Sequence, residues 1–192
     1  DRSQLPGLGD APAVGVLFGQ RARSGSKREL VILLKPTVIT EPGLPGMPGT
    51  VTVDDSESHS IQHWWNAGLD HCTGPALVLN DDITATPEDL VTLFDALENA
   101  DVVYLSGHRI GHYTPLTGWC YGIRPDKIRP SNDYGWWGGD DDLYLRATRD
   151  GLAVAAVDIP AIQHQRSAAP FENPIHAAMV DADMTLLHER WG

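Results

Sequence analysis

The chain has 192 residues, of which 42% are hydrophobic and 21% are charged, and these proportions are typical of a globular domain with a real hydrophobic core. Its formal net charge of −12 argues against nucleic acid as a partner, because phosphate binding depends on clustered Lys and Arg. The longest apolar run, Leu30 to Leu34, is too short for a helix that spans a membrane. Cys72 and Cys120 are expected to be free thiols in a reducing compartment, which favours the cytoplasm.

A turn-rich segment divides the chain. Residues 41–49 contain three Pro-Gly pairs, which block both helices and sheet ladders, so a linker is predicted there. Charge changes at the same place. Residues 1–40 hold six basic and three acidic residues, whereas residues 41–192 hold eight basic and twenty-three acidic ones. The predicted organisation is therefore a short segment over 1–40, a linker over 41–49 and an acidic domain over 50–192.

The first segment is predicted to form a β-hairpin. Turn residues alternate with apolar ones over 5–18, a basic stretch follows, and a second apolar run covers 29–36. The sequence of residues 5–18 and 29–39 resembles the end of the channel domain of secretins, the outer-membrane pores of bacterial secretion systems. This resemblance implies a bacterial or phage protein and, for this segment alone, a place in the cell envelope. One hairpin cannot build such a pore, so pore function is not expected to carry over.

After the linker, strand and helix patterns alternate, which predicts an α/β fold with a mainly parallel sheet and helices on its faces. Thr86 is expected to cap a helix that has Pro87 at its first position. The predicted strands are 50–53, 76–79, 101–106, 117–123, 152–157 and 159–164, and the predicted helices are 60–72, 86–100 and 140–149.

Asn80-Asp81-Asp82 directly follows the buried strand over 76–79. Ligands in open α/β sheets bind beyond the carboxyl ends of the strands, and carboxylates there suit Mg²⁺ or Mn²⁺ bound to a substrate diphosphate. The same tripeptide could simply end the strand and open a turn. His164, at the end of a later strand, could complete a metal site with Asp82, although a lone histidine is more often a surface or hydrogen-bonded residue.

Residues 136–142 form the second acidic cluster, in which Trp136, Trp137, Gly138 and Gly139 precede three consecutive aspartates. One of these carboxylates could act as a general base, because neighbouring carboxylates raise its pKa. Acidic residues at a helix N-terminus are also favoured by the helix dipole. The tryptophans could stack on sugar rings or belong to the core.

Several stretches together resemble, in chain order, the glycosyltransferases of the GT-A fold, with family 2 and galactosyltransferase-like members closest. They cover about residues 50–192, and they are 51–56, 65–69, 76–83, 138–146 and 162–164. This resemblance implies transfer of a sugar from a nucleotide-sugar donor to an acceptor hydroxyl, with Mn²⁺ or Mg²⁺ as cofactor. An inverting reaction is expected.

The resemblance also implies roles for individual residues. It implies Asp82 and His164 as metal ligands and Asp140 as the catalytic base, with Asp141 as runner-up. The nucleotide would be bound by Asp54, Asp55, Asn80 and Asp81, and the acceptor by Trp136, Trp137, Gly138 and Gly139. The chain departs from the family pattern at Asn80, which replaces an Asp, and at Gly139, which replaces a Glu.

The nucleotide-binding strand that normally begins the GT-A domain is missing, and the secretin-like segment and the linker stand in its place. An exposed sheet edge is then expected, which predicts self-association. Two alternatives remain open from the sequence: a subunit or fragment of a secretin-type channel, and a fusion module without activity.

Overall fold

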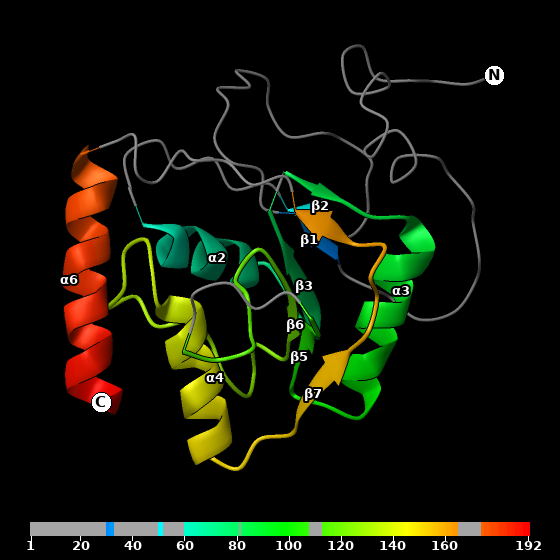
Figure 1. Ribbon diagram of the computed structural model, residues 1–192. Helices are drawn as coiled ribbons and strands as arrows, with labels where there is room; N and C mark the ends of the chain where they lie inside the picture. Colours follow the sequence, from blue (N-terminus) through cyan, green and yellow to red (C-terminus); the bar gives the residue numbers. More distant parts are fainter. Residues whose placement is uncertain (1–29, 33–49, 52–59, 81, 108–112, 165–173) are drawn as a thin grey trace.

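The computed structural model describes residues 30–32, 50–51, 60–80, 82–107, 113–164 and 174–192. The chain forms a mixed α/β fold around a six-stranded sheet with the order β2-β1-β3-β6-β5-β7 (Figure 1). The strands of this sheet are β1 (Leu30–Ile32), β2 (Thr50–Val51), β3 (Ala76–Leu79), β5 (Val102–Leu105), β6 (Cys120–Ile123) and β7 (Val154–Val157). A separate two-stranded sheet pairs β4 (Ile83–Thr84) with β8 (Gln163–His164).

The main sheet is mixed, not purely parallel. β1 is parallel to β2 and to β3, and β5 is parallel to β7, whereas β6 is antiparallel to both of its neighbours, β3 and β5. Because β6 is antiparallel to β5, it begins at the edge where β5 ends and runs back. This reversal brings the start of β6 beside the carboxyl ends of β3 and β5.

The expected hairpin over residues 5–18 and 29–36 lies mostly outside the described residues. Within it, Leu30–Ile32 forms β1, which lies between β2 and β3 and pairs in parallel with both. Residues 30–32 of the first segment thus belong to the main sheet of the domain.

Helices cover both faces of the sheet. α2 (Ile61–Leu69), α4 (Gly139–Arg149) and α6 (Pro174–Trp191) lie on one side, and α3 (Pro87–Asp95) lies on the other, followed by the short 3₁₀ helix η1 (Ala96–Glu98) (Figure 1). Alternate residues of each strand point to opposite faces, so Ala76 and Val78 join the core beneath α2 and α4. Leu77 and Leu79 join the core beneath α3.

The start of α3 agrees with the prediction from its sequence. Thr86 accepts a hydrogen bond from the backbone N–H of Asp89 at 3.2 Å, and the Asp89 carboxylate accepts one from the Thr86 N–H at 3.0 Å. Pro87 occupies the first turn. This reciprocal capping box satisfies backbone donors that a helix start leaves without partners.

α6 was not predicted from the sequence. It begins at Pro174 and continues for 18 residues to Trp191, alongside α2 and α4. Its sequence is rich in helix formers, but apolar residues occur around the whole helix. No single apolar stripe therefore indicates an amphipathic helix here.

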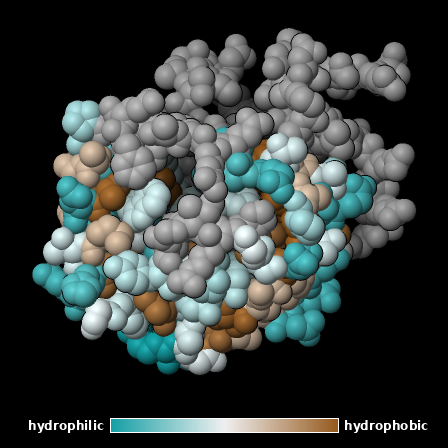
Figure 2. All heavy atoms as spheres, in the orientation of Figure 1, coloured by the Kyte–Doolittle hydropathy of each residue, from teal (hydrophilic) through white to brown (hydrophobic). Residues whose placement is uncertain are grey.

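On the face of the molecule shown in Figure 2, hydrophobic residues are scattered among hydrophilic ones and do not gather in one large patch. The large hydrophobic side chains that are exposed among the described residues, Val91, Tyr113 and Ile175, lie on different elements. Single exposed apolar residues are usual on globular proteins and mark no interface.

None of the helices in the described parts of the chain combines the length and the apolar character that a membrane span requires.

Candidate active site

Of the predicted site residues that the structure describes, Asn80 and Asp82 lie at one edge of the main sheet, and His164 lies beside Asp82. β3, β5 and β7 end at this edge, and β6 begins there. Asp82 follows β3 closely, and Gly118 and Trp119 directly precede β6. The carboxyl ends of parallel strands are the usual place for ligands in such sheets, so the arrangement fits a binding site.

Asp82 and His164 come from distant parts of the chain and meet here. Ile83 of β4 pairs with His164 of β8, and the neighbouring Asp82 carboxylate oxygen Oδ1 lies 3.0 Å from His164 Nε2. Both atoms are buried, and within the described residues neither has a hydrogen-bond partner. The two groups form an ion pair when His164 is protonated. A carboxylate and a neutral imidazole at this separation could also bind one divalent cation together.

Trp119 holds the histidine from the other side. Its indole ring is stacked on the His164 imidazole, with ring centroids 5.0 Å apart and an angle of 7° between the planes. The Trp119 carbonyl also accepts a hydrogen bond from the Asn80 N–H at 2.9 Å. The residues before β6 therefore fix both His164 and the segment that leads to Asp82.

The three adjacent aspartates lie in the first turn of α4, where they point to different partners. Gly138, with a φ of 69°, turns the chain into the helix, and Asp140, Asp141 and Asp142 are all buried. Their charges lie at a helix N-terminus, which the helix dipole stabilises. Mutual repulsion is limited because each carboxylate has its own set of donors.

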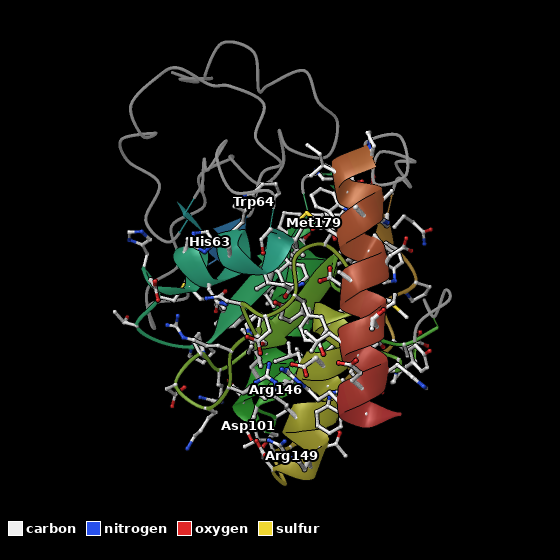
Figure 3. The ribbon with its side chains drawn as sticks, turned by 90° about the vertical axis from the view of Figure 1, so that its left-hand side faces the viewer. His63, Trp64, Asp101, Arg146, Arg149 and Met179 are labelled. Carbon is white, nitrogen blue, oxygen red and sulfur yellow. The ribbon has the colours of Figure 1, made fainter. Side chains whose placement is uncertain are left out.

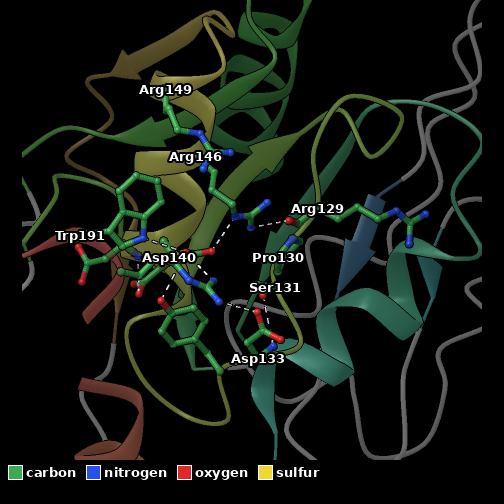
Figure 4. Close-up of polar contacts among 12 residues, drawn as sticks. Arg129, Pro130, Ser131, Asp133, Asp140, Arg146, Arg149 and Trp191 are labelled. Carbon is green, nitrogen blue, oxygen red and sulfur yellow. Dashed lines mark hydrogen bonds and ion pairs between the residues drawn. The ribbon is translucent and has the colours of Figure 1, made fainter. Parts of the chain in front are cut away.

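Asp141 and Asp142 are held by structural contacts. Asp141 Oδ1 accepts hydrogen bonds from the backbone N–H and the hydroxyl of Thr114, both at 2.7 Å. Asp142 has a fully buried side chain and is paired with Arg146 at 2.6 Å and Arg190 at 3.2 Å. It also accepts a hydrogen bond from the Trp191 indole N–H at 3.0 Å (Figure 4).

Asp140 contacts the segment that directly precedes β6. Its Oδ2 accepts a hydrogen bond from the Gly118 N–H at 2.8 Å, and its Oδ1 accepts one from the Asp141 N–H at 3.1 Å. Gly118 adjoins Trp119, which stacks on His164, so a single dipeptide connects Asp140 with the Asp82–His164 pair. Asp140 is 7% exposed.

Three buried polar atoms near Asp140 have no hydrogen-bond partner among the residues that the structure describes: Gln62 Oε1, Thr117 Oγ1 and the Tyr121 hydroxyl. Burial raises the pKa of Tyr121 well above its ordinary value, and the Asp140 carboxylate raises it further. The Gln62 amide lies against Gly139, where a Cβ would come within 2.6 Å of three atoms of the amide. Buried polar groups are nearly always paired, so such a group of unpaired atoms indicates a place for a polar ligand or water.

Trp136 and Trp137 precede this turn. Trp136 is 8% exposed, with its ring stacked on His176 of α6 at 3.8 Å between centroids, and it meets the Trp64 ring edge-on at 6.1 Å. Figure 3 shows Trp64 on α2 and Met179 on α6 close to this region. Trp137 is half-buried. Trp136 is thus largely enclosed by protein, and stacking of either ring on an acceptor sugar stays a prediction.

Other predicted residues lie outside the described residues. These are Asp54, Asp55 and Asp81, which the resemblance assigns to nucleotide binding. Asn80, half-buried at the end of β3, is described. In the described part of the chain, no group of three or more His, Cys, Asp or Glu side chains is arranged to hold a metal ion, so Asp82 and His164 stand as a two-residue candidate.

Comparison with known proteins finds a family for the first segment. The model of the secretin family, described as bacterial type II and III secretion system protein, matches residues 1–40. The predicted resemblance of this segment is thereby confirmed, but the match covers 40 of 192 residues and includes none of the site residues. No curated protein matches the chain.

Several residues of the site were missed from the sequence. Gln62, Thr117 and Tyr121 lie on elements whose patterns predicted only a helix and a strand. A polar residue on the apolar side of a helix, as Gln62 is beside Trp65, is the kind of signal that could have identified one of them. The sequence around Trp119 gave no indication that it belongs to the site, because only the tertiary structure places it against His164.

Proposed function

We propose that this protein transfers a sugar from a nucleotide-sugar donor to an acceptor hydroxyl, with inversion at the anomeric carbon and with a divalent cation. The proposal rests mainly on the meeting of Asp82 and His164, with Oδ1 and Nε2 3.0 Å apart at the carboxyl edge of the sheet. The connection from this pair to Asp140 through Gly118 and Trp119 supports it. The GT-A resemblance of residues 50–192 supplies the reaction class.

The donor side would use Asp82 and His164. A carboxylate and an imidazole suit Mn²⁺, and a carboxylate also suits Mg²⁺. Two protein ligands are few for a resident ion, which fits a cation that is shared with the diphosphate of the donor. When bound, the cation would neutralise charge on the departing nucleoside diphosphate. Asn80, Asp81, Asp54 and Asp55 are proposed to contact the nucleotide.

The acceptor side would use Asp140 as general base. Asp141 is engaged by Thr114, and Asp142 by two arginines, so these two carboxylates serve the structure of the turn. Asp140 accepts hydrogen bonds from the Gly118 and Asp141 N–H groups and lies beside the buried polar groups of Gln62, Thr117 and Tyr121. It would take the proton of the acceptor hydroxyl while that oxygen bonds to the anomeric carbon and the bond to the diphosphate breaks.

Gln62 is proposed to bind the acceptor beside this base. Its amide occupies the space next to Gly139, at the position where the glycosyltransferase pattern has a Glu. Its Oε1 is buried and has no hydrogen-bond partner within the described residues, so a hydroxyl group of the acceptor could donate to it. Gly139 itself offers no side chain, so a group from α2 would take over the polar contact.

The donor side can be tested by thermal shift with UDP-, GDP- and TDP-sugars, with and without Mn²⁺. We expect one nucleotide to raise the melting temperature only when Mn²⁺ is present, since a ligand that binds the native state stabilises it. Asp82→Asn should abolish this effect. Asp126→Asn removes the same charge from an exposed site after the other end of β6 and should preserve it. A wild-type protein that responds to no nucleotide would contradict the proposal.

The base can be tested in the same protein. Asp140→Asn is expected to lower the rate of sugar transfer by about 10²–10⁴-fold, the usual contribution of a general base. The nucleotide-dependent shift should persist, because Asp82 and His164 are unchanged. Undiminished transfer by this variant would remove the assignment of Asp140.

A second candidate function follows from the secretin match. Residues 1–40 would then mark the chain as a subunit or fragment of a secretion channel. Electron microscopy of the purified protein distinguishes the two proposals: ring-shaped assemblies would favour the channel, whereas monomers or small oligomers would count against it. A chain that neither forms rings nor binds nucleotide would fit the inactive fusion module.

A further inference from the structure

One face of α6 runs along the segment that contains the proposed base. The residues on this face are spaced by three or four positions and contact residues 134–142 in turn; they are His176, Met179, Asp183, Leu187 and Arg190. The contacts extend from the ring of Trp136 to the carboxylate of Asp142. The helix therefore follows the segment along most of its length.

Asp183 lies at the centre of this face. Its Oδ1 accepts a hydrogen bond from the Gly135 N–H at 2.9 Å, and its Oδ2 accepts hydrogen bonds from the N–H groups of Trp136 at 2.7 Å and Trp137 at 2.9 Å. Asp183 is 6% exposed. A buried carboxylate that takes three consecutive backbone donors is a strong anchor, because hydrogen bonds to a charged acceptor are about twice as strong as neutral ones.

The neighbouring contacts hold the same segment from both sides. A Cβ at Gly135 would meet Met179 Cε, and a Cβ at Gly138 would lie 3.4 Å from Leu187 Cδ2, so the backbone and α6 are in direct contact. On the other side, the Ile61 N–H at the start of α2 donates to the Gly135 carbonyl at 2.8 Å. The segment is clamped between α2 and α6.

We propose that Asp183 is a positioning residue, which fixes residues 135–137 and thereby sets the place of Asp140 relative to the acceptor. The inference rests on the proposed function for its catalytic consequence, while the anchoring itself stands on the contacts. Donor binding should be independent of Asp183, because Asp82 and His164 are held by β4, β8 and Trp119.

The test compares Asp183→Asn with Asp181→Asn, an exposed position on the same helix. Asn keeps the shape of Asp but turns an N–H₂ group toward backbone donors and removes the charge. Hydrogen exchange of the Gly135, Trp136 and Trp137 amides is measured by NMR or mass spectrometry. We expect these amides to exchange about tenfold faster or more in Asp183→Asn and at the wild-type rate in Asp181→Asn. Wild-type exchange in Asp183→Asn would overturn the anchor.

Kinetics test the positioning role in the same variants. Asp183→Asn is expected to lower kcat for transfer by about tenfold or more, with an unchanged KM for the nucleotide-sugar and an unchanged Mn²⁺-dependent thermal shift. Faster exchange with full kcat would overturn the positioning of Asp140. If the wild-type protein neither binds nucleotide nor transfers sugar, the proposed function fails, whereas the exchange data still decide the anchor.

A third variant covers the case in which Asp183→Asn does not fold, as judged by far-ultraviolet circular dichroism. Asp183→Glu keeps an acceptor carboxylate but moves it by one methylene group. Faster exchange at the three amides in this variant would uphold the anchor, and exchange at the wild-type rate would overturn it.

Discussion

At the residue scale, the three adjacent aspartates of α4 are separated by their partners. Asp141 accepts a hydrogen bond from Thr114, and Asp140 accepts one from the Gly118 N–H just before β6. Asp142 forms ion pairs with Arg146 and Arg190 and accepts a hydrogen bond from Trp191. Any of the three could be a base from its residue type alone, and the resemblance to glycosyltransferases placed Asp140 first and Asp141 second. The donors that other elements supply differ between the three carboxylates, and this difference supports the proposal that Asp140 is the base.

Asp142 should matter for stability. Asp142→Asn is expected to lower the free energy of unfolding by about 3–5 kcal/mol, because it leaves the partly buried guanidinium groups of Arg146 and Arg190 without their shared anion. The measurement is urea denaturation followed by far-ultraviolet circular dichroism. Asp150→Asn, at the exposed end of the same helix, should leave the midpoint almost unchanged. A midpoint for Asp142→Asn equal to that of the control would show that the cluster is not stabilising.

The two cysteines should differ in reactivity. Burial raises the pKa of the Cys120 thiol to about 12, so this thiol stays protonated at neutral and mildly alkaline pH, and the thiolate is the reactive form. Cys72 is half-buried near the end of α2. We expect Ellman's reagent at pH 8 to label Cys72 in the native protein and both cysteines in the denatured protein. Rapid native labelling of Cys120, identified by peptide mass, would contradict its burial.

At the scale of elements, helices and strands with a clear capping motif or apolar periodicity could be predicted from the sequence. The capping box at Thr86 and the apolar period of 60–72 predicted the starts of α3 and α2 to within one residue, but both α-helices end earlier than predicted, α3 at Asp95 and α2 at Leu69. α6 was missed because its residues lack a single apolar face, and its importance depends on which segment it contacts. The antiparallel direction of β6 could not be predicted from its sequence either, because the alternation of residues in a strand is the same in both directions.

A substitution at Gly122 of β6 can test how closely η1 packs on the sheet. A Cβ at this position would lie 2.5 Å from Val103 Cγ2 and 2.9 Å from Leu97 Cδ1, both of which are in the core. Gly122→Ala is expected to cost about 1–3 kcal/mol through overpacking, as measured by thermal denaturation. Gly74→Ala is the control, because a Cβ there meets no atom within 4 Å. Equal melting temperatures would mean that the core at β6 can adjust freely.

At the scale of the whole molecule, the secretin-like segment and the acidic domain share a sheet. Leu30–Ile32 lies between β2 and β3, beside the strand that leads to the proposed metal site. Backbone pairing therefore joins residues on both sides of the change in charge at the Pro-Gly segment over 41–49. A strand from a segment of separate sequence character thus lies inside the main sheet, between β2 and β3.

This pairing can be tested at Val31. Val31→Pro removes a backbone N–H and should lower the melting temperature, because proline cannot donate to a sheet ladder. Val31→Thr keeps the N–H and a β-branched side chain, so its effect should be smaller. Differential scanning calorimetry measures both variants. Identical transitions for the proline variant and the wild type would show that β1 contributes no stability.

The sequence by itself determined the α/β class, the capped start of α3 and the secretin likeness of residues 1–40. These features depend on residues that are neighbours in the chain, so local chemistry is enough to predict them. The tertiary structure alone decided that Asp82 meets His164, that Trp119 stacks beside them, and that Asp183 of α6 holds the segment before Asp140. Those contacts join residues from different elements, and only the packing of helices on a mixed sheet brings them together.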